Sequence, residues 1–237
     1  DYLKYFVSGE ARRAPLINRG SESSVLWIVG YYARVAAVRQ ILRDFLTGPG
    51  NPKKQIVSLG AGFDTTYFCF KEYLSTNVGL RLSSLIGFEV DFPQQMQKKG
   101  KLIQKHKPLL ELVSMGSHFL NFRALDANAT GTDLQIVGAD LRNIEDLETT
   151  LTKAGLDYSL PTFFLSECVL VYLKAEDSAK VISWAASKFK GGAVFCTYEQ
   201  ILPNDPFGKT MKENLESRGC TLLGLDAYPD LEAQKQR

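Results

Sequence analysis

The sequence predicts an α/β protein whose open, mostly parallel sheet carries helices on both faces. Three observations support this fold class. Short apolar runs alternate five times with segments of helical periodicity along the 237 residues. No internal repeat or low-complexity linker interrupts the alternation, so we expect one domain over residues 1–237. Carboxylates close several of the runs, at the edge where sheets of this class bind ligands.

The predicted elements follow from periodicity and from turn signals. A first helix is predicted over residues 31–46, where apolar side chains recur at spacings of three and four before the turn 47–50. The predicted strands are residues 55–59, 85–91, 134–138, 161–167 and 193–199. Further helices are predicted from near Asp64, from Pro93, around residues 144–151 and over residues 175–189. Residues 107–132 lack a clear period, and we expect them to connect elements.

The loop after the first strand is the most informative segment. The apolar run stops at Gly60 and Gly62, with Asp64 just behind. Glycines there let the backbone approach a ligand closely. A dinucleotide fingerprint would have a third glycine where Thr65 stands, so a nicotinamide or flavin site matches poorly. A shorter loop, with Asp91 closing the next strand, suits S-adenosylmethionine, which has no pyrophosphate.

The bulk composition excludes several other classes. A net charge of +2 is too small to indicate nucleic-acid binding. No apolar run approaches the ~18 residues of a membrane span, and no secretory signal begins the chain. The four cysteines are far apart, and only two histidines are present. We therefore expect a cytoplasmic protein with free thiols, no metal site, no membrane segment and no histidine-dependent nucleophile.

Motif strings stand in a distinctive order at residues 12–20, 31–34, 59–66, 89–93, 138–142, 160–162, 166–172, 198–200 and 207–211. In this order they closely resemble the leucine carboxyl methyltransferase family. That family transfers a methyl group from S-adenosylmethionine to the α-carboxylate of the C-terminal leucine of the protein phosphatase 2A catalytic subunit. The resemblance implies a class I, Rossmann-like methyltransferase fold, and it covers nearly the whole chain.

The resemblance also implies site residues. The cofactor contacts fall on Arg34, Gly60, Asp91, Asp140, Leu141 and Glu167. Arg34 can fork onto the methionine carboxylate, and Glu167 can bind the ammonium. Asp91 can accept both ribose hydroxyls. Asp140 can accept from the adenine amine while Leu141 donates a backbone N–H.

The substrate carboxylate needs cationic or hydroxyl donors, and Tyr172 and Arg19 are the candidates. Structural alternatives stand beside some of these roles. Arg34 could be an ordinary residue on the polar face of its helix, Asp140 could be a helix N-cap, and Tyr172 could pack in the core. Asp64 is interpreted as a helix cap and not as a ligand.

Two departures from the family pattern matter. In the family, the string ending at Gly20 runs directly into the string beginning at Tyr31, whereas here residues 21–29 intervene. We interpret them as an atypical insertion, either a surface segment or a gene-model artefact. The chain also lacks the family's N-terminal basic contact and its last strands and helices. The sequence is therefore interpreted as a fragment truncated at both ends.

The expected chemistry needs no general base, because a carboxylate is already ionised at neutral pH. The enzyme's work is then to desolvate the nucleophile and align it. The resemblance implies the phosphatase 2A catalytic subunit as partner of a monomeric enzyme. One alternative is the related branch that methylates a carboxylate on tRNA during wybutosine synthesis. Another is a catalytically silent protein that binds S-adenosylmethionine.

Overall fold

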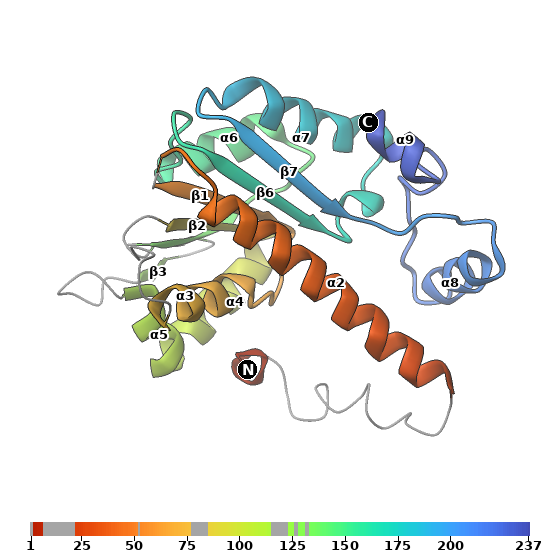
Figure 1. Ribbon diagram of the computed structural model, residues 1–237, viewed down its shortest axis with the longest axis horizontal. Coiled ribbons are helices and arrows are strands. Elements are labelled where there is room, and N and C mark those ends of the chain that lie inside the picture. Colours follow the sequence, from red (N-terminus) through yellow and green to blue (C-terminus); the bar gives the residue numbers. More distant parts are fainter. Residues whose placement is uncertain are drawn as a thin grey trace.

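Strands and helices alternate along the chain (Figure 1). The computed structural model describes residues 2–6, 22–51, 53–76, 85–114, 123–125, 128–130 and 133–237. The strands are β1 (Lys54–Leu59), β2 (Leu85–Asp91), β3 (Arg123–Leu125), β4 (Asn128–Thr130), β5 (Leu134–Gly138), β6 (Thr162–Glu167) and β7 (Ala193–Tyr198). The helices are α2 (Glu22–Thr47), α3 (Thr66–Thr76), α4 (Pro93–Lys105), α5 (Lys107–Ser114), α6 (Ile144–Lys153), α7 (Ala175–Lys188), α8 (Pro206–Glu216) and α9 (Leu231–Lys235). Short 3-10 turns are η1 (Leu3–Tyr5) and η3 (Leu170–Tyr172).

The strands form a sheet in the order β3-β4-β5-β2-β1-β6-β7. The five strands from β5 to β7 in this order pair in parallel, whereas β3 and β4 pair antiparallel. The parallel strands, numbered along the chain, thus read 3-2-1-4-5, and the order reverses between β1 and β6. Leu59 at the end of β1 pairs with Val90 on one side and Ser166 on the other. The predicted fold class is therefore confirmed, with the carboxyl ends of the central strands at one edge.

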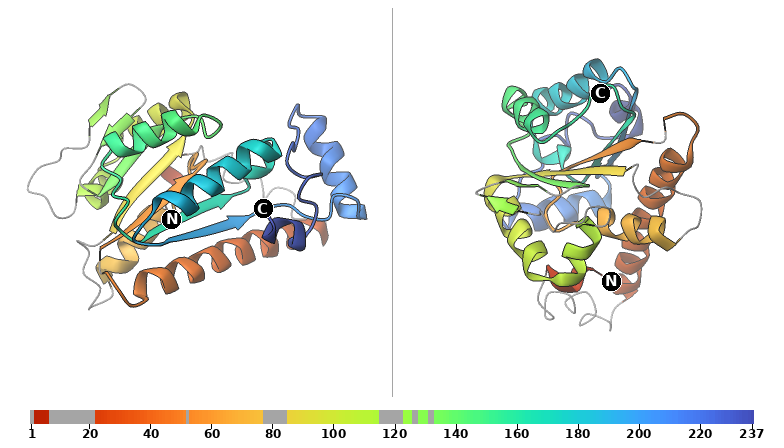
Figure 2. Two further views of the ribbon diagram at one scale, coloured as in Figure 1. Left: turned by 90° about the horizontal axis from the view of Figure 1, so that it is seen from above. Right: turned by 90° about the vertical axis from the view of Figure 1, so that its left-hand side faces the viewer.

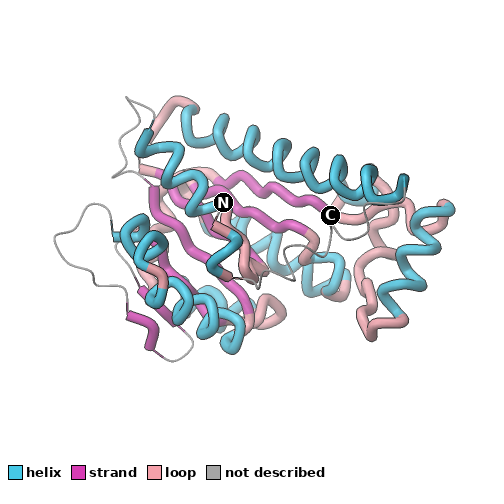
Figure 3. Tube along the Cα trace, turned by 90° about the horizontal axis from the view of Figure 1, so that it is seen from below, coloured by secondary structure: helices cyan, strands magenta, loops and turns pink. Residues whose placement is uncertain are grey.

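Two apolar cores lie on opposite faces of the sheet. Neighbouring strand residues point to opposite faces, so Phe163 joins one core and Phe164 the other. The first core is completed by side chains of α2, α3, α4 and α5, and the second by α6 and α7. Figure 2 shows these two helix layers on either side of the sheet, and Figure 3 shows α2 lying along the strands of the first face. Both faces are covered, as expected for parallel strands.

The prediction that residues 107–132 only connect elements is wrong in part. The segment contains α5, β3 and β4. Helix α5 buries Leu109 and Val113, a single i, i+4 pair that is too short to stand out as a period. Strands β3 and β4 have three residues each, too few to show an alternation. Helices α8 and α9 lie beyond the last predicted strand.

Helix α2 is longer than the predicted 31–46, because its backbone is already helical at Glu22. The interpreted insertion 21–29 therefore continues, from its second residue, into the same helix. Five apolar residues in a row are awkward in a surface loop but are compatible with a helix. Although α2 has 26 residues, none of the helices in the described part of the chain is long and apolar enough to cross a membrane.

Deleting residues 21–29 is expected to leave the fold intact and to improve solubility or activity. Among the α2 side chains that the structure describes, from Gly30 onwards, Val38 and Leu42 are buried in the core, and the backbone of the first turns of α2 extends past the sheet (Figure 1). Circular dichroism and a thermal melt would measure the outcome. Leu42→Ala is the control and should cost about 2–5 kcal/mol, because this side chain is fully buried. Aggregation of the deletion variant would show that the segment is a necessary structural part.

Candidate functional site

The loop from Gly60 to Asp64 joins β1 to α3 at the point where the strand order reverses. Gly60 has φ +64°, and a Cβ there would lie 2.5 Å from Cγ2 of Val169. Only glycine fits this backbone position. The Ala61 N–H donates to the Val90 carbonyl at 2.9 Å, and the Asp64 N–H donates to the Ala61 carbonyl at 2.7 Å. The loop is thus attached to the end of β2 and folded on itself.

Asp91 closes β2 and binds the same loop. Its Oδ2 accepts from the Gly62 N–H at 2.8 Å, and its Oδ1 accepts from the Phe92 N–H at 2.7 Å. A carboxylate offers about four lone-pair sites, so these two bonds leave acceptor capacity for a ligand. Asp91 therefore contacts the glycine loop directly, as expected from its position at the end of the next strand.

A cavity of about 280 Å³ opens at the carboxyl ends of β1 and β6. It is lined by Arg34, Ser58, Leu59, Gly60, Ala61, Gly62, Phe63, Asp64, Leu165 and Glu167. Arg34 reaches it from α2 and forms an ion pair with Glu167, which closes β6. The Arg34 guanidinium also lies 5.4 Å from the ring centroid of Tyr198. One cation and one anion therefore lie side by side at the wall of a cavity, so Arg34 faces the sheet edge and is not simply directed to solvent.

The remaining sequence-predicted residues do not line this cavity or lie outside the described residues. Asp140 and Leu141 follow β5, whose last residue pairs with Asp91, but neither lines the cavity. Tyr172 is on η3 and is 41% exposed, so it is not a core residue. Arg19 lies outside the described residues.

Asp140 is engaged by Arg142. The guanidinium forks onto the carboxylate, with Nε 2.9 Å from Oδ1 and Nη2 2.5 Å from Oδ2. This hydrogen bonding lowers the pKa of Asp140 below its usual range. The alternative of Asp140 as a helix N-cap is wrong, because Asn143 caps α6 by accepting from the Asp146 N–H. Arg142 itself is largely exposed, so it can move aside for a ligand.

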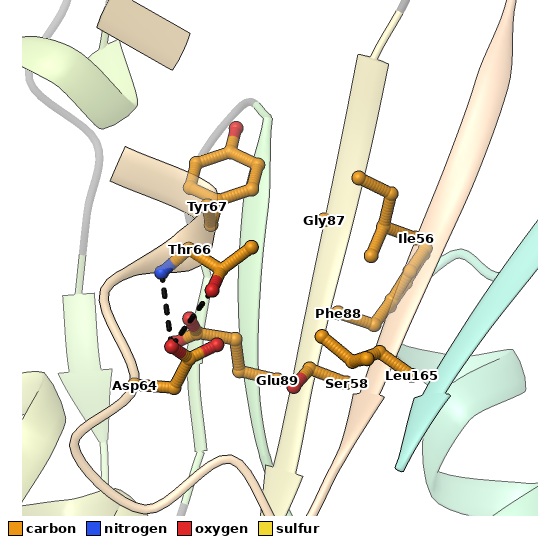
Figure 4. A pocket seen from close by; sticks show the side chains of 9 residues that line it. All are labelled: Ile56, Ser58, Asp64, Thr66, Tyr67, Gly87, Phe88, Glu89 and Leu165. Atoms are coloured by element: carbon orange, nitrogen blue, oxygen red, sulfur yellow. Dashed lines mark hydrogen bonds between the residues drawn. The ribbon is translucent and has the colours of Figure 1, made fainter. Parts of the chain in front are cut away.

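Asp64 lies one residue before the N-cap position of α3, where its side chain bonds the first helical residue, and it also lines the cavity. Its Oδ1 accepts from the N–H and the hydroxyl of Thr66 at 3.1 and 2.9 Å, at the start of α3 (Figure 4). These two bonds fix the junction between the glycine loop and α3.

The segment after β6 is held by Glu199, a residue that sequence reasoning did not assign. The Glu199 carboxylate accepts from the N–H groups of Val169, Leu170 and Val171 at 3.0 to 3.4 Å. Burial raises the pKa of Glu199 despite these bonds. Because η3 carries Tyr172, Glu199 fixes the start of the turn on which a predicted site residue lies. The available signal was position: Glu199 is an acid directly after a strand.

Cys168, between Glu167 and this segment, has φ +55°, which is unusual for any residue other than glycine. Its N–H donates to the Tyr198 carbonyl at 2.7 Å, which ties β6 to β7. Burial raises the pKa of the Cys168 thiol to about 11, although Arg34 is nearby. The thiol is therefore neutral at physiological pH and unsuited to act as a nucleophile.

The sheet order, the glycine loop and the carboxylates at the strand ends define a Rossmann-like α/β protein of the class I methyltransferase type. A family model described as leucine carboxyl methyltransferase matches residues 5–186. The chain belongs to the leucine carboxyl methyltransferase family.

Relatives of two kinds match the whole chain. A leucine carboxyl methyltransferase 1 homolog of Arabidopsis thaliana is 39% identical, and the match spans 65% of it. Leucine carboxyl methyltransferase 1 of Rattus norvegicus is also 39% identical, over 66% of its length. The tRNA wybutosine-synthesizing protein 4 of Homo sapiens is 40% identical over 32% of its length. The chain thus spans about two thirds of the first kind and one third of the second.

A solved O-methyltransferase family protein from Burkholderia thailandensis superimposes on 78% of this chain and 46% of its own. The TM-score is 0.44 and the identity 16%, a similarity too low to inform on function. The identities to the two kinds of family member are nearly equal, so identity alone does not separate their acceptors.

Proposed function

We propose that the protein transfers a methyl group from S-adenosylmethionine to the α-carboxylate of the C-terminal leucine of a protein phosphatase 2A catalytic subunit. The observation that carries this proposal is the Arg34–Glu167 pair beside the glycine loop, in a chain of the leucine carboxyl methyltransferase family. When bound, the cofactor supplies an activated methyl group on a positively charged sulfur.

The residues at the cavity fit this cofactor. Its amino-acid end carries one carboxylate and one ammonium, and Arg34 and Glu167 offer the opposite charges side by side. Gly60, with φ +64° and Val169 packed where a Cβ would lie, gives the backbone the turn that brings the loop to the cavity. The spare acceptor capacity of Asp91 suits two ribose hydroxyls.

Asp140 and Leu141 would contact the adenine at the end of β5. In this role Asp140 accepts from the adenine amine, and the backbone N–H of Leu141 donates to the ring. The Asp140 carboxylate is two-thirds buried beside an exposed Arg142, so a ligand can share or replace the guanidinium. The low pKa of Asp140 keeps it ionised and accepting at neutral pH.

The acceptor carboxylate needs orientation and exclusion of water, not a base. Tyr172 can supply orientation, since its hydroxyl is on the segment that follows Glu167. Burial raises the pKa of Tyr172, so the phenol stays protonated at neutral pH and can donate to a carboxylate. Arg19 remains a candidate for the same task from sequence alone.

The second candidate acceptor is a carboxylate on a modified guanosine of tRNA, favoured by the 40% identity to tRNA wybutosine-synthesizing protein 4. The nearly neutral net charge of +2 favours the phosphatase, because tRNA binding would need a basic surface. A cofactor-binding protein without activity is the third candidate, and the same assay tests it.

Radiolabelled cofactor, incubated with the protein and an intact phosphatase 2A catalytic subunit, is expected to label the phosphatase. Phosphatase that lacks its terminal leucine should stay unlabelled, because the accepting carboxylate is lost. Glu167→Gln serves as the enzyme control and should greatly reduce labelling.

Label in bulk tRNA alone would assign the chain to the wybutosine branch. Equal label in truncated phosphatase would refute specificity for the terminal carboxylate. Cofactor binding without label in any acceptor would favour the silent binding protein.

A further inference from the structure

An ion pair is buried next to the glycine loop. Glu89 of β2 and Lys99 of α4 are 2% and 0% exposed, and Nζ lies 2.8 Å from Oε2. Such a pair is expensive to bury, and an apolar pair of the same size is often at least as stable. Stability alone therefore does not explain why these residues are here.

The carboxylate of Glu89 is poorly satisfied. Although Lys99 is close enough for an ion pair, within the part of the chain that the structure describes neither oxygen of Glu89 has a hydrogen-bond partner of good geometry. Figure 4 shows the carboxylates of Glu89 and Asp64 near one another at a cavity of about 10 Å³. A buried polar group without good partners points to a role other than stability.

The second contact of Lys99 suggests that role. Its Nζ donates to the main-chain carbonyl of Asp64 at 2.8 Å. Asp64 is the last residue of the glycine loop, and its own N–H donates to Ala61. Lys99 therefore holds the far end of the loop, and Glu89 holds the Lys99 ammonium where it can reach that carbonyl.

We propose that Glu89 and Lys99 are positioning residues that keep the Gly60–Asp64 loop in the conformation that contacts the cofactor. Neither residue touches the ligand in this proposal; both act through the Asp64 carbonyl. The identity of the ligand rests on the proposed function. The effect of Glu89 and Lys99 on the conformation of the loop does not depend on it.

Because the charge of Glu89 depends on pH, this positioning role can be tested by changing the pH. Burial raises the pKa of Glu89 to about 7; Lys99 opposes this shift, and Asp64 adds to it. Tyr67 of α3 also faces Glu89, and burial keeps its phenol neutral in this range by raising its pKa. Above pH 7 the ion pair forms and holds Lys99 in place. Below it, Glu89 is neutral and no longer attracts the ammonium.

Stability and loop order should change in opposite directions. The pKa of Glu89 is higher in the folded protein than its ordinary 4.5. Its contribution to stability is therefore complete below about pH 4.5 and is lost as pH rises through about 7. The Gly60–Asp64 loop, in contrast, should become better ordered as the pH rises through about 7, because the ion pair then forms. A pair with a purely structural role would not produce this opposition.

The test compares wild type, Glu89→Gln and Glu89→Gln/Lys99→Met by amide hydrogen exchange of the loop in cofactor-free protein and by calorimetry with S-adenosylmethionine. Wild-type cofactor affinity should fall severalfold from pH 8 to pH 6. Glu89→Gln should bind about tenfold more weakly at pH 8, because the charge-assisted hydrogen bond from Lys99 to the Asp64 carbonyl is no longer held in place, with no further change at pH 6. Loop amides should exchange faster in both variants.

The double variant separates positioning from stability. Replacing both charges by neutral groups should retain or raise the melting temperature, yet the loop should still exchange fast and affinity should stay about tenfold lower. The matched control is Lys71→Met. Lys71 is equally buried and ion-paired 2.5 Å from Asp133, at the opposite edge of the sheet. This control should lose stability but retain the wild-type loop exchange and pH dependence.

Wild-type loop exchange in both Glu89 variants would overturn the inference. Failure of the wild-type protein to bind S-adenosylmethionine would instead overturn the proposed function, and the exchange measurements on cofactor-free protein would still decide whether Glu89 and Lys99 order the loop.

Discussion

Replacing Asp91 with alanine is expected to weaken S-adenosylmethionine binding by about 3–6 kcal/mol, because two hydrogen bonds to a charged acceptor would be lost at ~1.5–3 kcal/mol each. This corresponds to an increase in Kd of about a hundredfold or more. The change also removes the acceptor of the Gly62 N–H, which joins the glycine loop to β2. Isothermal titration calorimetry would measure the effect directly.

Two controls make this result interpretable. Asp91→Asn keeps the size and one acceptor oxygen, so it should bind better than Asp91→Ala. Asp226→Ala removes an exposed carboxylate that pairs with Lys212 of α8, and it should bind like wild type. Wild-type affinity in a folded Asp91→Ala protein would contradict the assignment of Asp91 to the cofactor site.

Replacing Gly87 with alanine is expected to lower the free energy of unfolding by about 1–3 kcal/mol, the usual cost of overpacking a core. A Cβ at this position of β2 would lie 2.5 Å from two ring carbons of Tyr67. The ring has little room to move, because it is 4% exposed and its hydroxyl donates to the Asp133 carbonyl at 2.8 Å. Urea denaturation would measure the loss.

Gly30→Ala is the matched control. Gly30 is inside α2, and a Cβ added there would have no neighbour within 4 Å among the described residues outside its own stretch of helix. Alanine there should raise stability by up to ~1 kcal/mol, since glycine is a poor helix former. Equal effects of the two substitutions would show that the contact with Tyr67 does not restrict position 87.

The positions of the five parallel strands along the chain and the edge that holds the site were predictable because both depend on local signals, whereas the order of the strands in the sheet was not predicted. Apolar runs mark the strands, and residues such as Glu167 mark their ends. Arg34 was predicted from its motif, and the structure brings it to Glu167 across 133 positions of sequence. That pairing follows from the packing of α2 on the sheet, which no local pattern encodes.

The residues that were missed act through tertiary contacts. Glu89 is inside a strand and begins the motif string 89–93, and Lys99 is one of several lysines in the sequence of α4. Burial of both side chains appears only when α4 packs against the sheet. Asn143, and not Asp140, caps α6 because the turn at residues 141–142 delays the helix start.

The bonds from Glu199 to the backbone after β6 have a consequence for protein engineering. Three consecutive N–H groups depend on one carboxylate from the residue that follows β7. A graft that exchanges the 168–172 segment between family members, in order to change the acceptor, must therefore transfer residue 199 with it. The smallest exchangeable module is discontinuous in sequence, and a library that varies the segment alone would sample mostly misplaced loops.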